Sequence, residues 1–96
     1  MNSEPRDTRL RRLRMRSWRR GTREMDLILG PYADARLAGL DAEALAAFEA
    51  LLAENDQDLY AWVSGRSQPP AGHAPTLGEL REFHGIGQVQ PDAAGR

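Results

Sequence analysis

The sequence predicts an all-α fold, a small single-domain five-helix bundle, from its composition and from the helical spacing of its apolar residues. Its 96 residues include 14 Ala and 12 Leu but only two Val and two Ile, a bias that favours helix over sheet. Apolar residues recur three and four positions apart, and glycines or capping residues separate these runs. A chain of this length forms one domain at most and buries a modest core. We therefore do not expect an enzyme with a deep pocket of its own.

The first helix is expected after a flexible N-terminus that covers residues 1–8. Asp7 or Thr8 can cap this helix, which then runs to about residue 19. Its inner face carries three small or apolar residues, Leu10, Leu13 and Ser17. Arginines occupy most other positions, so the helix has little to bury alone and needs neighbouring helices.

The second helix contains an unusual glycine–proline pair. Gly21 interrupts the preceding helical pattern, and the second helix is expected to begin at the next residue. Gly30 and Pro31 stand in its middle. Because proline lacks a backbone N–H and clashes with the preceding turn, it kinks or ends a helix. We expect a kinked helix that continues to about residue 37 and is closed by Gly39.

The third and fourth helices have the clearest patterns in the chain. Asp41 is the expected N-cap of the third helix. Its buried stripe consists of Leu45, Phe48, Leu51 and Leu52. Asn55 and Asp56 end this helix and can cap the fourth helix, with Asp56 as the favoured cap. The fourth helix stops at Gly65. The buried residues of the fourth helix are Leu59, Trp62 and Val63.

The last third of the chain carries weaker signals. Residues 66–75 form a Pro/Gly linker by composition. Residues 76–85 are expected to form a short helix, with Thr76 and Glu79 in a capping-box pattern. Residues 86–96 contain one Val and one Ile among Gly, Pro, Gln and Asp, so a disordered and dispensable tail is expected.

Charge is distributed unevenly along the chain. Residues 1–23 hold nine Arg against two acids, a net +7, whereas residues 24–58 hold nine acids against one Arg, a net −8. All thirteen basic residues are Arg, whose guanidinium binds carboxylates and phosphates through paired hydrogen bonds. The N-terminal cluster therefore predicts an acidic partner, either a nucleic acid or a protein surface.

No residue set for catalysis, cofactor binding or metal binding is recognisable in the sequence. The chain has no cysteine, and His73 and His84 stand eleven positions apart without another ligand nearby, a poor metal spacing. It contains no phosphate-binding glycine motif and no nucleophile–base pair. No apolar run approaches the roughly 20 residues of a membrane span, and no secretory signal follows the basic N-terminus, so a cytoplasmic protein without membrane contact is expected.

Four aromatic residues at helical spacing are expected in the core, Trp18, Phe48, Trp62 and Phe83.

One short segment, Arg20-Gly21-Thr22-Arg23-Glu24, points to a function. A glycine between two arginines at a helix junction permits close approach of another backbone, or a φ angle that other residues avoid. In a continuous helix, Arg20 and Glu24 would pair across one turn. With a turn at Gly21, they would instead flank an exposed backbone patch.

Two stretches, RSWRRGTREMDLILGPYAD and LAAFEALLAENDQDLYAWVSG, resemble the small assembly factors of succinate dehydrogenase, the SdhE-type family. The RGxxE motif of that family falls on Arg20, Gly21 and Glu24. A second signature, Asp-x-Asp-Leu-x-x-Trp, falls on Asp56, Asp58, Leu59 and Trp62. The resemblance covers about residues 9–65, the predicted helical core, and the C-terminal third carries no diagnostic residues.

The resemblance implies a five-helix bundle that binds the flavoprotein subunit of succinate dehydrogenase near its FAD site and promotes covalent attachment of FAD. In this family the flavoprotein's own histidine forms the bond to the flavin. The small protein is therefore expected to act as a chaperone-like assembly factor, neither an enzyme nor a cofactor carrier. Fumarate reductase is a second candidate client.

The resemblance also implies which residues bind the partner: Arg20, Gly21, Glu24, Arg16, Arg19 and Arg23. Gly21 would admit the partner's backbone, and Arg20 would offer its guanidinium to a carboxylate or a flavin-side acceptor. Glu24 would orient Arg20 or pair with a partner arginine. Asp56 and Trp62 are expected to stabilise the fold instead of touching the partner.

Two alternatives of other classes stay open, an arginine-rich nucleic-acid-binding module and a regulatory protein-interaction module. The basic first helix suits phosphates. The acidic middle of the chain opposes this interpretation, because it would repel the same phosphates. A salt titration of DNA binding separates the first alternative, and a pull-down from a native lysate separates the second.

Overall fold

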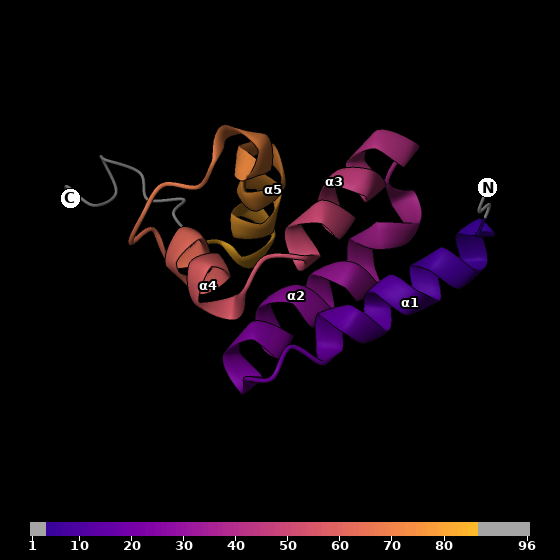
Figure 1. Ribbon diagram of the computed structural model, residues 1–96, viewed down its shortest axis with the longest axis horizontal. Helices are drawn as coiled ribbons and strands as arrows, with labels where there is room; N and C mark the ends of the chain where they lie inside the picture. The colour runs from indigo at the N-terminus through magenta and orange to yellow at the C-terminus, as the bar shows by residue number, and fades with distance from the viewer. Residues whose placement is uncertain (1–3, 87–96) are drawn as a thin grey trace.

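The computed structural model describes residues 4–86 of the chain. Within these residues it contains five α-helices, two short 3-10 helices and no strand (Figure 1). The helices are α1 (Arg6–Trp18), α2 (Arg23–Arg36), α3 (Ala42–Leu52), α4 (Asp56–Ser64) and α5 (Ala74–His84), and the 3-10 helices span Leu37–Gly39 and Ala71–His73. The predicted all-helical fold with five helices is confirmed.

All five helices contribute to one hydrophobic core. Helices α1 and α2 lie side by side, α3 and α5 pack on the same side of this pair, and α4 lies beyond them (Figure 1). Each helix contributes at least one completely buried side chain. Examples, from α1 to α5, are Leu13, Leu29, Phe48, Leu59 and Leu80. Because each helix buries its apolar stripe against the others, none of the stripes is left to solvent.

Helix α1 begins at Arg6, inside the segment expected to be flexible. No side chain caps it, but Glu4 pairs with Arg12 and thereby ties the entering chain to the helix. The inner stripe predicted for this helix is confirmed, since Leu10, Leu13 and Ser17 are all buried. The Ser17 hydroxyl donates to the Leu13 carbonyl at 2.8 Å, which satisfies the polar group inside the core.

Helix α2 continues through Gly30 and Pro31 to Arg36, as expected, but the predicted closure by Gly39 is wrong, because a 3-10 helix of Leu37–Gly39 follows instead. The reason for the glycine is Trp18, whose ring lies so close that a Cβ at Gly30 would be 2.3 Å from it. The indole Nε1 donates to Asp34 at 3.2 Å. Trp18 nevertheless stays 39% exposed, so its predicted place in the core is wrong. It packs over the α2 backbone at Gly30 and bonds to the exposed Asp34.

The caps of α3 and α4 differ in how well the sequence predicts them. Asp41 caps α3 as expected and accepts a hydrogen bond from the Ala44 amide at 2.8 Å. Helix α4 is capped by Asn55, which accepts from the Asp58 amide, and not by Asp56 as predicted. The apolar stripes predicted for both helices are buried: Leu45, Phe48, Leu51, Leu52, Leu59, Trp62 and Val63. Helix α4 ends at a left-handed glycine, as its sequence predicts.

Helix α5 starts at Ala74, two residues before the predicted start. Thr76 is therefore inside the helix and buried, and the predicted capping box does not form. Pro75 occupies the first turn, where its missing N–H costs no hydrogen bond. The early start is possible because the end of the linker is itself helical, in the 3-10 helix Ala71–His73.

Both histidines fasten the C-terminal part of the chain to the rest. His73 bonds to Glu54 at 2.8 Å and packs against Trp62 with ring centroids 5.7 Å apart. His84 donates from Nε2 to the Ile28 carbonyl at 2.7 Å. Ile86 is partly buried against the core, although the sequence predicts disorder from that residue on. The remainder of the predicted tail, 87–96, lies outside the described residues.

No helix formed by residues 4–86 has both the length and the apolar character that crossing a membrane requires.

An ion-pair cluster joins α1 to α3. Glu49 accepts hydrogen bonds from Arg9 at 3.0 Å and from Arg12 at 2.9 Å, and Arg12 also contacts Glu4 at 2.9 Å. Burial alone would raise the pKa of Glu49, but the hydrogen bonds from Arg12 and Arg9 outweigh it and lower that pKa. The hydrogen bond from Arg12 also lowers the pKa of Glu4.

This cluster predicts a pH-dependent contribution to stability. Because folding lowers the pKa of Glu49, its stabilising effect is complete above the unfolded pKa of about 4.3 and is lost as the pH falls through the lower folded value. Glu49→Gln should therefore be less stable than the wild type at pH 7, and the difference should shrink below about pH 4. Urea denaturation at a series of pH values measures this. Glu43→Gln, an exposed change on the same helix, is the control. A Glu49→Gln difference that stays constant down to pH 3 would contradict the prediction.

The buried aromatic at the centre of α3 gives a prediction for the core. Phe48→Ala should lower the free energy of unfolding by about 3–5 kcal/mol, because it removes a completely buried ring and leaves a cavity in the core. A loss of that size approaches the whole stability of so small a domain. Chemical denaturation followed by circular dichroism checks it, with the exposed Leu27→Ala as the control. Equal midpoints for the two variants would show that the core is assigned wrongly.

Candidate functional site

The RGxxE motif forms the turn between α1 and α2. The amide of Arg20 donates to Asp26 at 2.7 Å, and the Thr22 hydroxyl accepts from the Met25 amide at 3.2 Å, so both sides of the turn are fixed. Gly21 between them has φ +111°, a conformation that strains any residue with a side chain. A Cβ there would meet only a carboxylate oxygen at 3.8 Å. The backbone conformation, and not lack of space, therefore requires the glycine.

Arg20 points into the domain. Its side chain is only 10% exposed. Nε donates to Asp56 at 2.9 Å, and the two terminal nitrogens donate to the carbonyls of Leu52 and Glu54, each at 2.7 Å. Arg20 thus binds the α1–α2 turn to the α3–α4 turn and satisfies carbonyls that the end of α3 leaves without partners. Its guanidinium has a structural role in addition to any contact with a partner.

The two sequence signatures meet at this ion pair. Asp56 of the second signature was predicted to cap α4, but its carboxylate binds Arg20, while Asn55 makes the cap. Asp58 accepts a hydrogen bond from the Asn55 side chain at 2.9 Å. Trp62 is buried, as expected of a stabilising residue. The sequence shows both signatures, but it does not show that they are in contact, because Arg20 and Asp56 are 36 positions apart.

Glu24 lies on the other side of the turn and is exposed. Within residues 4–86 it forms no ion pair with Arg20, because the helix containing Glu24 starts only after the Gly21 turn. Of the two arrangements left open by the sequence, the structure has the second: residues 21–24 are all exposed and form a backbone patch.

A hollow of about 600 Å³ opens beside this patch. We call it the motif hollow; Thr22, Glu24, Met25, Asp56, Gln57, Tyr60 and Arg66 line it. Tyr60 is 39% exposed, and the Arg66 guanidinium carbon lies 5.8 Å from its ring centroid. The lining holds two carboxylates, of which that of Asp56 is paired with Arg20, together with the Tyr60 phenol and the Arg66 guanidinium. Sequence reasoning missed Tyr60 and Arg66; the only signal was that Tyr60 lies off the buried stripe of α4.

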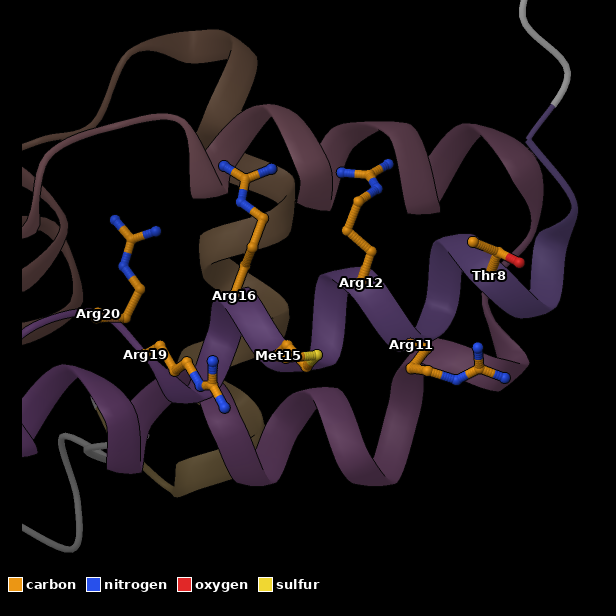
Figure 2. Close-up of a pocket in the computed structure, with 7 residues that line it drawn as sticks. All are labelled: Thr8, Arg11, Arg12, Met15, Arg16, Arg19 and Arg20. Carbon is orange, nitrogen blue, oxygen red and sulfur yellow. The ribbon is translucent and has the colours of Figure 1, made fainter.

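The six predicted partner-binding residues do not form one continuous surface. Gly21 and Glu24 lie at the exposed turn, and Arg23 is exposed beside them. Arg16 and Arg19 belong instead to the outer face of α1, where they line a different hollow and point to opposite sides of the helix (Figure 2). Arg20 is the residue common to both regions, since it lines the second hollow and binds Asp56 of the first.

Comparison with known proteins places this architecture in a family. Residues 11–84 match the family model described as flavinator of succinate dehydrogenase. The chain belongs to the flavinators of succinate dehydrogenase. This range contains both signatures and the whole of α2 to α5. The resemblance noted from the sequence is thereby confirmed, and it extends beyond residue 65 into the C-terminal third.

Individual relatives differ in length. The FAD assembly factor SdhE of Pseudomonas aeruginosa is 43% identical over 86 residues, which cover 90% of this chain and 96% of the relative. Succinate dehydrogenase assembly factor 2-B, mitochondrial, of Drosophila mojavensis is 35% identical over 83 residues, or 84% of this chain. The chain spans about half the length of that relative. The FAD assembly factor SdhE of Legionella pneumophila is 41% identical over 51 residues, 53% of this chain and 65% of the relative.

The inward orientation of Arg20 predicts that flavinators need it for stability. Arg20→Ala should lower the free energy of unfolding by at least about 1.5–3 kcal/mol, since it removes hydrogen bonds from a charged donor and leaves Asp56 unpaired. Arg20→Lys should rescue little, because an ammonium group cannot reach three acceptors in a plane. Urea denaturation measures both, and the exposed neighbour Arg19→Ala is the matched control. If Arg20→Ala and Arg19→Ala unfold at the same urea concentration, the structural role of Arg20 is refuted.

Proposed function

We propose that this chain binds the flavoprotein subunit of succinate dehydrogenase and promotes covalent attachment of FAD to it. Membership of the flavinator family supports the proposal. The single structural observation that carries it is the exposed turn of residues 21–24, where the motif arginine faces the domain and the motif glutamate faces solvent. A motif glutamate that is exposed and forms no ion pair within residues 4–86 is suited to contact another protein.

The proposed mechanism is a shift in the conformational equilibrium of the partner. The factor would bind the arrangement of the flavoprotein in which its own histidine can bond to the flavin, and would bind other arrangements less well. A tenfold shift in that equilibrium requires about 1.4 kcal/mol of differential affinity. One charge-assisted hydrogen bond is sufficient for this. The role is therefore chaperone-like and needs no catalytic group or bound cofactor in the factor itself.

The docking surface is proposed to consist of the exposed turn and the motif hollow. The Gly21 backbone would lie against the partner backbone, and Glu24 and Arg66 would pair with charged partner side chains. Arg20 would act from beneath by fixing the turn. Arg16, Arg19 and Arg23 are proposed to extend this surface on its basic side. Fumarate reductase stays a second candidate client, and a cytoplasmic location stays a prediction.

Ion pairing within the domain weighs against the nucleic-acid alternative. Arg9, Arg12 and Arg20 are three of the nine arginines near the N-terminus, and each is paired with a carboxylate of the same domain. The main source of nonspecific affinity for a nucleic acid is the release of counterions when arginines neutralise its phosphates. An arginine that is already paired with a carboxylate neutralises a phosphate poorly and therefore releases few counterions. No measurable binding to duplex DNA at about 50 mM salt is the expected result.

The exposed motif glutamate gives the sharpest functional prediction. Glu24→Ala should weaken binding to the flavoprotein by about 1–3 kcal/mol, if it forms a charged hydrogen bond there. Covalent flavin fluorescence of the flavoprotein in a denaturing gel should fall accordingly, in cells that lack their own factor. Gly21→Arg is a poorer test, because at φ +111° any side chain also strains the fold.

Glu43→Ala provides a matched control for this experiment. Glu43 is the second residue of α3, as Glu24 is the second residue of α2, and both are exposed. The two changes therefore remove the same favourable charge from the start of a helix. Full flavin attachment with both variants would overturn the proposed docking surface.

A further inference from the structure

Arg16 and Arg19, on the basic side of the proposed docking surface, line a second hollow on the outer face of α1. It has a volume of about 490 Å³. Five arginines line it together with Met15 and Thr8 (Figure 2): Arg11, Arg12, Arg16, Arg19 and Arg20. We call it the arginine groove. A cluster of so many like charges on one face is unfavourable unless it is neutralised or used.

The groove has an apolar centre and charged sides. Arg12, Arg16 and Arg20 follow one another at intervals of four residues and point to the side where α3 runs, whereas Arg11 and Arg19 point to the other side (Figure 2). Met15 lies between the two rows and is 47% exposed. A ligand with one apolar side chain between negative groups would match this pattern.

The arginines at the two ends of the groove are already neutralised. Arg12 binds Glu4 and Glu49, and Arg20 binds Asp56. In contrast, none of Arg11, Arg16 and Arg19 forms an ion pair within residues 4–86. The ion pairs fix the side chains of Arg12 and Arg20 at the ends of the groove. The other three guanidinium groups can bind a ligand.

We propose that the arginine groove binds an acidic segment of the partner protein, with an apolar side chain on Met15 and carboxylates on Arg11, Arg16 and Arg19. Guanidinium groups bind carboxylates through paired hydrogen bonds. The inference rests on the proposed function, because the segment is taken to belong to the flavoprotein client. Arg20 supports this link, since it lines the groove and also binds Asp56 of the motif hollow. One partner surface can therefore cover both hollows.

A protein segment fits the groove better than a nucleic acid does. A phosphate backbone repeats its charge along its whole length, and the carboxylates of Glu4, Glu49 and Asp56 at the groove ends would repel it. The centre offers Met15, which has no aromatic face for base stacking. An acidic peptide, in contrast, can carry its carboxylates only at the positions that face Arg11, Arg16 and Arg19 and none at the groove ends.

Peptide binding to the full chain tests the proposal directly. The probe is a short fluorescein-labelled peptide in which glutamates flank one leucine, followed by fluorescence anisotropy. Arg16→Gln/Arg19→Gln should weaken binding about tenfold or more, because each lost charged hydrogen bond can account for that factor. Replacing the peptide leucine by glycine should weaken binding as well, and added salt should weaken it further.

The control variant is Arg14→Gln/Arg36→Gln, which loses the same charge outside both the arginine groove and the motif hollow and should bind the peptide like the wild type. Circular dichroism of both double variants should match the wild type. Equal weakening in both double variants, no binding of the glutamate–leucine peptide, or tighter binding of a single-stranded DNA of equal charge would each overturn the proposal.

The same variants separate the groove from the proposed function. Glu24→Ala should leave peptide binding intact while lowering flavin attachment. Arg16→Gln/Arg19→Gln should lower both. If peptide binding fails while the Glu24 effect on flavin attachment holds, the groove assignment is wrong and the docking surface at the turn stands.

Discussion

The hydrogen bonds of Arg20 are the interaction on which the rest of the site depends. One guanidinium joins the α1–α2 turn to the α3–α4 turn through Asp56 and two backbone carbonyls. Without it, the end of α3 would keep unsatisfied carbonyls beside a half-buried carboxylate, at a cost comparable to a large part of the stability of a small domain. The same contact fixes where the Gly21 turn is exposed. Stability and the geometry of the docking surface are therefore not independent here.

This coupling explains why the motif combines an arginine, a glycine and a glutamate. The arginine faces the core side of the turn, the glycine adopts a backbone angle that no other residue accepts without strain, and the glutamate stays in solvent. Each residue type has a separate task at one turn. Substitutions at the three positions should consequently fail in different ways, by unfolding, by strain and by loss of contact. Measurements of binding alone would not distinguish these causes.

The arginines of α1 also have separate tasks, since some stabilise the fold and others are available to a partner. Its inner face is too small to hold it by packing alone, and the ion pairs of Arg9 and Arg12 with Glu49 attach it to α3. Arg11, Arg16 and Arg19 form no ion pair within residues 4–86 and lie around the exposed Met15. Glu49 of α3, together with Glu4, thus neutralises one side of a basic helix and leaves the other side for a partner. The uneven charge along the sequence has both a structural and a binding consequence.

The sequence by itself determined the helical class, the apolar stripes of α3 and α4, the Asp41 cap and the family, because these depend on local spacing and on motifs of neighbouring residues. It also indicated the turn at Gly21. It could not determine that Asp56 binds Arg20, that Trp18 lies over Gly30, or that α5 starts before Thr76. Each of these depends on which segments meet in space: an aspartate at a helix start serves equally well as a cap or as an ion-pair partner, and only the approach of Arg20 decides between them. The separation of the predicted site into a motif hollow and an arginine groove has the same origin, since Arg16 and Arg19 are close to Glu24 in sequence but lie on the other side of the Gly21 turn.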